Sequence, residues 1–196
     1  MSAQFHLRTA TRDDIPALRS LIERSIRSLQ KDDYTQAQMD GAIGHVLGLD
    51  TQLIEDQTYF LAETHTPDKT LAGCGGWSMR GTPFGSDHGP ERSNILLNPV
   101  TDHARIRAIF VHPDFARQGL GTLLLDHCEL QAQHAGFTRF QMGSTLTGRA
   151  LYLLRGYKEQ AQINVPLPNG EVLPILHMTR ELPLDASAAP VSILKT

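Results

Sequence analysis

Two glycines one residue apart, Gly119 and Gly121, lie beside Arg117 at a junction between two segments of different character. The segment before them, 105–111, is apolar and rich in β-branched and aromatic residues, whereas the segment after them is leucine-rich with helical spacing. The first residues of a helix expose unpaired backbone N–H groups, and glycine lets a ligand approach the backbone closely. The junction is therefore suited to an anionic ligand such as a diphosphate.

A strand-to-helix turn that needs glycine only for tight packing is the alternative interpretation of this junction. Two other phosphate-binding motifs do not fit the sequence. A Walker A loop requires lysine directly after glycine, and none of the lysines follows a glycine. A Rossmann fingerprint requires a third glycine where the chain has Leu124, and it belongs early in a βαβ unit, whereas this junction lies past the middle of the chain.

The run "RIRAIFVHPDFARQGLGTLLLDHCE", together with "RALYLLRGY" further on, resembles the Gcn5-related N-acetyltransferase family. The coenzyme A signature of that family is Gln/Arg-x-x-Gly-x-Gly/Ala, entered from a strand that ends in Val-x-Pro. The chain matches it at Val111, Pro113, Gly119 and Gly121. The first position of the signature is Ala116, with Arg117 next to it. A second family marker, Leu-Tyr-x-x-x-Gly-Phe/Tyr, is matched by residues 151–157.

The resemblance implies acetyl-coenzyme A as cosubstrate, with its diphosphate on the amides of 117–122 and its pantetheine arm along the strand before them. It places the amide of Ile109 against the thioester carbonyl, where it would stabilise developing negative charge. It places Tyr152 where its hydroxyl would protonate the leaving thiolate; a half-buried aromatic bonded to backbone is the alternative. The implied catalytic residues are Tyr152 and Ile109, and the implied cofactor-binding residues are Ile109, Phe110, Val111, Arg117, Gln118, Gly119, Leu120, Gly121 and Thr122.

The acceptor amine must lose a proton, because a lysine-like amine has a pKa of about 10.4. Many members of the family carry a glutamate for this purpose on the strand before the loop, at the position of Arg105. Asp102, His103 and Glu63 are substitutes that would work through water, and a solvated surface group is the alternative for each. The sequence therefore assigns no general base.

Hydrophobic periodicity and turn residues predict the elements that position these groups. Strands are expected over 4–9, 57–64, 70–79, 105–111, 137–144, 158–166 and 172–180, and helices over 11–29, about 35–48, 120–135 and 147–157. Their order predicts an α/β chain with one mixed sheet. The resemblance implies a GNAT-like fold, with a central, mostly antiparallel, splayed sheet of about seven strands and helices on both faces. We expect a single domain over 4–182, a loose tail over 183–196, and a long loop over 81–104 that is well placed to cover the acceptor side of the site.

Composition excludes several classes of function. The 196 residues carry a net charge of −3 and no basic cluster, which argues against a nucleic-acid partner. No apolar run is long enough to span a membrane, and no secretory signal is visible at the N-terminus, so we expect a cytoplasmic protein without a membrane partner. Cys74 and Cys128 are typical of small buried residues, and the nine histidines show no ligand spacing, so no metal is expected.

The sequence thus supports an N-acetyltransferase in which a small-molecule or peptide amine attacks acetyl-coenzyme A directly. A non-catalytic acyl-coenzyme A-binding sensor or regulatory module is the alternative. A purely structural interaction domain would leave the glycines of the turn unexplained. The sequence does not specify the acceptor, and it does not decide whether acyl groups other than acetyl are used. A homodimer is also possible, but no segment identifies an interface.

Overall fold

The computed structural model describes residues 5–89 and 92–183, which form one mixed sheet flanked by helices. The elements follow one another as β1 (Phe5–Thr9), η1 (Arg12–Asp14), α1 (Ile15–Leu29), α2 (Gln36–Ala42), α3 (Thr51–Glu55), β2 (Tyr59–Thr64), β3 (Leu71–Ser78), β4 (Ala104–Val111), η2 (Pro113–Phe115), α4 (Leu120–His134), β5 (Arg139–Ser144), α5 (Arg149–Leu154), β6 (Lys158–Pro166) and β7 (Val172–Glu181). The single domain stays a prediction, and the predicted tail beyond 183 lies outside the described residues.

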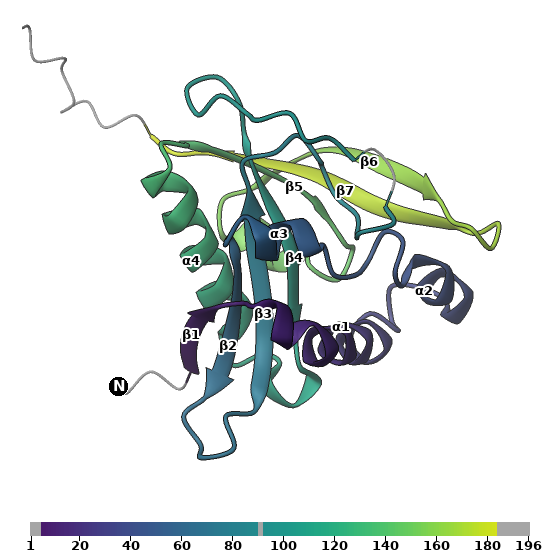
Figure 1. Ribbon diagram of the computed structural model, residues 1–196. Coiled ribbons are helices and arrows are strands. Elements are labelled where there is room, and N and C mark those ends of the chain that lie inside the picture. The colour runs from purple at the N-terminus through teal and green to yellow at the C-terminus, as the bar shows by residue number, and fades with distance from the viewer. Residues whose placement is uncertain (1–4, 90–91, 184–196) are drawn as a thin grey trace, which may run out of the picture.

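The seven strands are ordered β1-β2-β3-β4-β5-β7-β6 (Figure 1). Every neighbouring pair is antiparallel except β4 and β5, which are parallel. The parallel pair lies in the middle of the sheet and joins an N-terminal meander to a C-terminal hairpin. The predicted fold class, a mostly antiparallel mixed sheet with helices on both faces, is confirmed.

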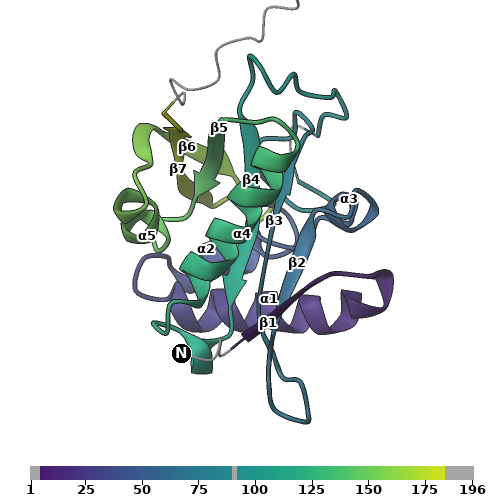
Figure 2. The ribbon, with the colours of Figure 1, turned by 90° about the vertical axis from the view of Figure 1, so that its left-hand side faces the viewer.

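Helices cover both faces of the sheet (Figures 1 and 2). On one face α1 buries Leu18, Leu21, Ile22 and Ile26 in a core shared with α2 and the segment 43–49. On the other face α4 buries Leu120, Leu124, Leu125 and Cys128, and α5 packs beside it. Each fully buried leucine or isoleucine contributes about 1.5–3 kcal/mol, so apolar burial on both sides fixes the helices to the strands.

The start of α1 is tied to the sheet by a small charged network. The Arg8 guanidinium donates to both carboxylate oxygens of Asp14, at 2.8 and 2.7 Å, and its Nε donates to Glu63 at 2.9 Å. The backbone N–H of Thr11 also donates to Asp14, at 2.8 Å. These donors, with Arg8 foremost, lower the pKa of Asp14 to about 2, although partial burial acts in the opposite direction.

The predicted weak helix over 35–48 is shorter in the structure, because the chain leaves the helical conformation after Ala42 and Gly44 takes a φ of 78°. The short helix α3 was not predicted; it begins after Asp50, whose side chain accepts the N–H of Gln52 at 3.1 Å. Cys74 and Cys128 are buried and unpaired, as expected. Across the described segments, no helix combines the length and apolar character needed to span a membrane.

Candidate active site

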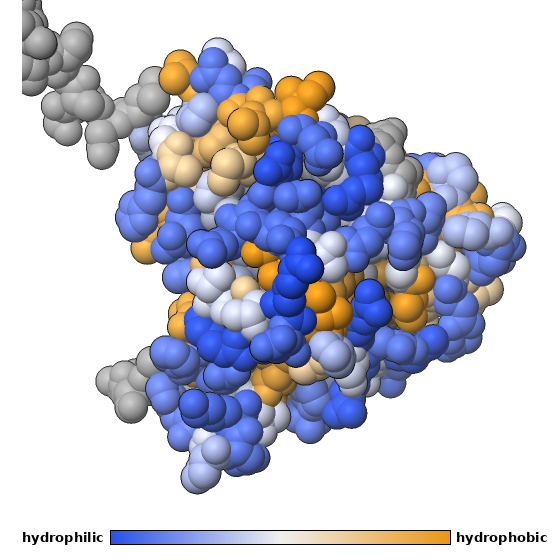
Figure 3. Space-filling view, viewed as in Figure 1, coloured by the Kyte–Doolittle hydropathy of each residue, from blue (hydrophilic) through white to orange (hydrophobic). Residues whose placement is uncertain are grey.

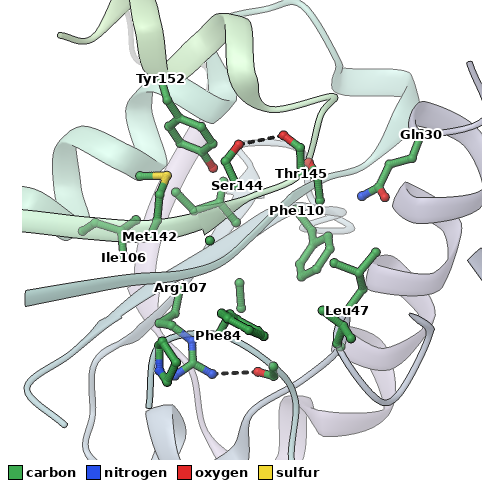
Figure 4. Close-up of a pocket in the computed structure, with 17 residues that line it drawn as sticks. Gln30, Leu47, Phe84, Ile106, Arg107, Phe110, Met142, Ser144, Thr145 and Tyr152 are labelled. Carbon is green, nitrogen blue, oxygen red and sulfur yellow. Dashed lines mark hydrogen bonds between the residues drawn. The ribbon is translucent and has the colours of Figure 1, made fainter. Parts of the chain in front are cut away.

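The two central strands, β4 and β5, separate after two residue pairs. Their Cα pairing is limited to Ala104 with Phe140 and Arg105 with Gln141. Beyond these pairs the strands splay, and the space between them holds a cavity of about 80 Å³ (Figure 4). Residues 106–110 of β4 form one wall of the cavity, and residues 142–145 at the end of β5 form the opposite wall.

β4 carries a β-bulge where it lines the cleft. Its register with β3 shifts between Cys74 and Gly76, and opposite this shift Ala108 has a φ of 51°. A non-glycine residue in this conformation costs about 1–3 kcal/mol, so the surroundings must hold it. The buried hydroxyl of Tyr59 donates to the carbonyl of Ala108 at 3.1 Å and supplies such a constraint.

The strand after the bulge directs backbone amides into the cleft. The N–H of His112 donates to the carbonyl of Ala72 in β3 at 2.8 Å. Since successive N–H groups of a strand point to opposite edges, the N–H of Phe110 also faces β3, whereas those of Ile109 and Val111 face the open edge toward β5. Of the three strand residues predicted to bind the cofactor, Ile109 and Phe110 line the cleft and Val111 does not; the side chain of Phe110 is shown in Figure 4.

The glycine-rich turn lies between β4 and α4. Arg117 and Gly119 have φ values of 62° and 82°, and Gly119 is the N-cap of α4. Within the described segments, the N–H groups of Arg117 and of residues 119–122 have no hydrogen-bond partner, as is normal for the first turn of a helix. The space beside Gly119 is open, because a Cβ placed there would meet nothing within 4 Å. The turn can therefore receive a large anionic group on its main chain.

The other predicted residues of the turn differ in where their side chains lie. The side chains of Arg117 and Gln118 are exposed, and Gln118 Nε2 donates to the carbonyl of Asp114 at 3.0 Å. Leu120 is buried in the core beneath β3, so it can contact a ligand only through its main chain. Gly121 packs against α5, since a Cβ there would lie 3.2 Å from Leu151.

Tyr152 lies on α5 and lines the same cleft, although α5 is far from β4 in the sequence. Its side chain is 8% exposed, and Figure 4 shows the hydroxyl pointing toward the space beside Ser144. Gly148 makes room for the ring, because a Cβ at Gly148 would lie 2.8 Å from Tyr152 Cε2. Burial, and secondarily the neighbouring Cys128, raise the pKa of Tyr152 above its ordinary value near 10, so the hydroxyl keeps its proton at neutral pH.

None of the three possible general bases is among the residues that line the cleft. Glu63 accepts the hydrogen bond from Arg8, and Asp102 accepts the N–H of Asn98 at 2.7 Å. His103 lies 3.8 Å from Glu181. The described residues also contain no group of three or more His, Cys, Asp or Glu that could hold a metal ion.

Three residues of the loop after β3 line the cleft, whereas its predicted role in covering the acceptor side stays a prediction. Pro83, Phe84 and Gly85 line the cavity opposite Tyr152. The loop is anchored by Arg107 of β4, which donates to the carbonyls of Thr82 at 3.1 Å and Gly85 at 2.6 Å. The face of the molecule seen in Figure 3 is mostly hydrophilic, with some hydrophobic groups visible near its centre.

Sequence analysis did not single out several residues that line the cleft. Gln30, at the end of α1, is buried, and its Oε1 has no hydrogen-bond partner among the described residues. Figure 4 shows its side chain extending toward Phe110. Leu47, Phe84 and Thr145 come from three other segments. No local pattern marks these residues, because only the tertiary fold brings them together.

The site combines four features: parallel strands that splay, a bulge where they separate, a glycine turn at the start of α4 and a tyrosine on α5. Together they are typical of the acetyltransferase class of fold and site. The sequence model of the acetyltransferase (GNAT) family matches residues 23–157. The chain therefore belongs to the acetyltransferase (GNAT) family, and it is an acetyl-coenzyme A-dependent N-acetyltransferase.

Solved structures share this fold at low sequence identity. The GCN5-related N-acetyltransferase from Rhodopseudomonas palustris is 21% identical with a TM-score of 0.65, and the match covers 93% of this chain and 98% of that one. The PaiA N-acetyltransferase from Thermoplasma acidophilum, in complex with coenzyme A, is 13% identical with a TM-score of 0.59, covering 93% and 100%. A GNAT-family acetyltransferase from Listeria monocytogenes is 18% identical with a TM-score of 0.60, covering 91% and 95%. Among curated proteins, none matches the chain significantly.

Proposed function

We propose that the chain moves an acetyl group from acetyl-coenzyme A to an amine, with the cofactor held by the turn 117–122 and the open edge of β4. The observation that carries this proposal is the continuity of main-chain donors. Unpaired N–H groups at the start of α4 and the outward N–H groups of Val111 and Ile109 lead along one path to Tyr152.

The residues present fit such a cofactor. A diphosphate at the start of α4 would accept hydrogen bonds from several amides and lie at the positive end of the helix dipole. An extended pantetheine arm would pair with the edge of β4 in the way that a peptide adds to a sheet. When bound, acetyl-coenzyme A supplies an activated acetyl thioester.

Ile109 and Tyr152 then act on opposite ends of the reacting group. The N–H of Ile109 donates to the carbonyl oxygen as it gains negative charge, an effect worth about 2.7–4 kcal/mol for a single donor in other enzymes. The hydroxyl of Tyr152 donates its proton to the departing sulfur. The hydroxyl is protonated at neutral pH, so it has a proton to give to the sulfur as the thiolate forms.

Thiol release from acetyl-coenzyme A, followed across an amine panel, tests this proposal. Release that requires both the cofactor and an amine supports acetyl transfer, whereas binding without turnover on any amine would favour the sensor alternative. Thermal unfolding with coenzyme A provides a separate measure of binding. Ligand at 100 times its dissociation constant should add about 2.7 kcal/mol to the free energy of unfolding; the absence of any stabilisation would contradict the proposal.

A further inference from the structure

A second cavity adjoins the cleft beneath the loop after β3. Its volume is about 210 Å³. The two cavities share a wall formed by Pro83, Phe84, Met142 and Gly143. The second cavity is completed by Gln141, Ile163 and His177. It therefore extends the cleft from the reacting centre toward β7, and the Phe84 side chain lies between the two spaces.

Two polar side chains, those of Gln141 and His177, line this cavity, and Arg105 lies beside them on the same face of the sheet without lining it. Arg105 and Gln141 are Cα partners across β4 and β5, so their side chains lie on the same side. His177 is the partner of Gly143, two residues beyond Gln141, and so it lies on that side as well. Phe84 packs on this face too, because a Cβ at Gly143 would lie 3.2 Å from its side chain.

Polar atoms of these three side chains lack hydrogen-bond partners among the described residues. Arg105 Nε and His177 Nε2 are both shielded from solvent, and neither has a hydrogen-bond partner among the described residues. The side chain of Gln141 makes no hydrogen bond within the same part of the chain. Shielding a charged or polar group without a partner costs free energy, so a side-chain movement that brought these atoms to an acceptor would be favourable.

The local charge is positive. Asp102 attracts the Arg105 guanidinium, but its carboxylate already accepts the N–H of Asn98 and forms no ion pair with Arg105 among the described contacts. Arg107, on the same strand, is neutralised by Asp50 at 2.8 Å. Burial, and then the charge of Arg105, lower the pKa of His177, so this imidazole is neutral at pH 7 and has one N–H to donate. An anion would find donors here, and the Arg105 guanidinium forms no ion pair with a carboxylate among the described residues, although the charge of Asp102 is close enough to act on it.

We propose that Arg105, Gln141 and His177 bind a carboxylate of the acetyl acceptor, whose amine reaches past Phe84 into the cleft. The inference rests on the proposed function and names its substrate class, an amine that also carries a carboxylate. The guanidinium and the Gln141 amide group supply donors that a carboxylate accepts well. Phe84 and Ile163 supply the apolar wall for the carbon skeleton between the two groups.

Matched pairs of amines, in which a carboxylate is replaced by a carboxamide of the same size, test the inference. Phenylalanine is compared with phenylalaninamide, and 6-aminohexanoate with 6-aminohexanamide, by thiol release and by calorimetric binding to the coenzyme A complex. Each acid should exceed its amide by about tenfold or more in kcat/KM and in affinity, as expected for charge-assisted hydrogen bonds. Arg105→Gln should remove this preference by lowering kcat/KM and affinity for the acids to about those of the amides, and His177→Gln should reduce it.

Arg139→Gln is the matched control, because Arg139 lies on β5, donates to the carbonyl of Val100 at 2.7 Å and is already engaged. This variant should keep the preference for acids. Equal behaviour of acid and amide, no binding of either acid, or a preference that survives Arg105→Gln would overturn the inference. Phosphoethanolamine is tested beside ethanolamine, and a preference for it above both acids would also overturn the carboxylate assignment. Failure of the proposed function looks different, since coenzyme A would then neither stabilise the protein nor release thiol with any amine.

Discussion

Arg107 and Asp50 form an ion pair of 2.8 Å in the protein interior, although 57 residues separate them in the sequence. Their side chains are 3% and 2% exposed. Arg107 belongs to the strand that lines the cleft, and Asp50 caps α3. The same guanidinium holds the loop after β3, so one residue joins the wall of the cleft, the loop above it and a helix on that face.

Breaking this pair should destabilise the fold. Asp50→Asn leaves the Arg107 charge buried without its counter-ion, which typically costs about 3–5 kcal/mol in the free energy of unfolding. Denaturant unfolding measures the change. The double variant Asp50→Asn with Arg107→Met should lose less than the two single variants added together.

Arg12→Gln is the control for this experiment, because its ion pair with Glu55 is exposed. Such an exposed pair contributes little to the free energy of unfolding, because solvent screens it. If Asp50→Asn cost no more than Arg12→Gln, or if the two single variants simply added, the coupling described here would be wrong.

Removing the Tyr152 hydroxyl should slow acetyl transfer without weakening the binding of coenzyme A. Tyr152→Phe keeps the ring that packs beside Tyr157 and removes only the proton donor. We expect kcat to fall by about 10²–10⁴-fold, the usual range for a positioned acid, with coenzyme A affinity unchanged. Steady-state kinetics and calorimetry measure the two effects.

Tyr157→Phe is the matched control, since the Tyr157 hydroxyl is 2.8 Å from Glu129, to which it donates. Its turnover should stay close to that of the parent protein. A Tyr152→Phe enzyme as active as the Tyr157→Phe enzyme would rule out the assignment of Tyr152 as the acid.

Shortening Phe84 should change which amines are accepted. Phe84→Ala would join the cavities of about 80 and 210 Å³ on its two sides. We expect kcat/KM to rise for bulky amines relative to small ones, measured over a size-graded amine panel. Ile95→Ala, in the same loop but 74% exposed, should leave the ranking unchanged. An unaltered ranking in Phe84→Ala would show that Phe84 does not separate the two cavities for a substrate.

The Arg8–Asp14 contact predicts a specific dependence of stability on pH. The pKa of Asp14 is depressed in the folded protein to about 2, below its ordinary value near 3.8. Its contribution is therefore present above about pH 4 and is lost as pH falls from there through 2. Asp14→Asn should reduce the free energy of unfolding by up to about 2 kcal/mol at pH 7 and by less at pH 2.5. Equal losses at both pH values would contradict the shift.

Much of the fold was predictable because the signals are local. The strands from β1 to β7 show alternation or β-branched runs between turn residues, and α4 is framed by Gly119 and Gly136. α3 was missed because five residues carry little periodicity. Its start depends on distant contacts, since Asp87 accepts both the N–H and the hydroxyl of Thr51, at 2.7 and 2.8 Å.

The candidate site likewise has one part that could be predicted from local sequence and one part that could not. Its main-chain part was predictable, because the positive φ at Gly119 and the strand before the turn are encoded in adjacent residues. The side-chain walls were not, because Gln30, Leu47 and Phe84 come from separate segments and meet only in the folded chain. From the sequence, Arg105 was notable only because it stands where many members of the family carry a glutamate. That Arg105 Nε lacks a partner required the structure.

A crystal structure with coenzyme A bound tests the central claim most directly. The account predicts diphosphate oxygens at about 2.7–3.2 Å from backbone nitrogens of residues 117–122, with the sulfur beside the Tyr152 hydroxyl. The opposite result would show those nitrogens bonded within the protein and the cofactor lodged elsewhere or absent.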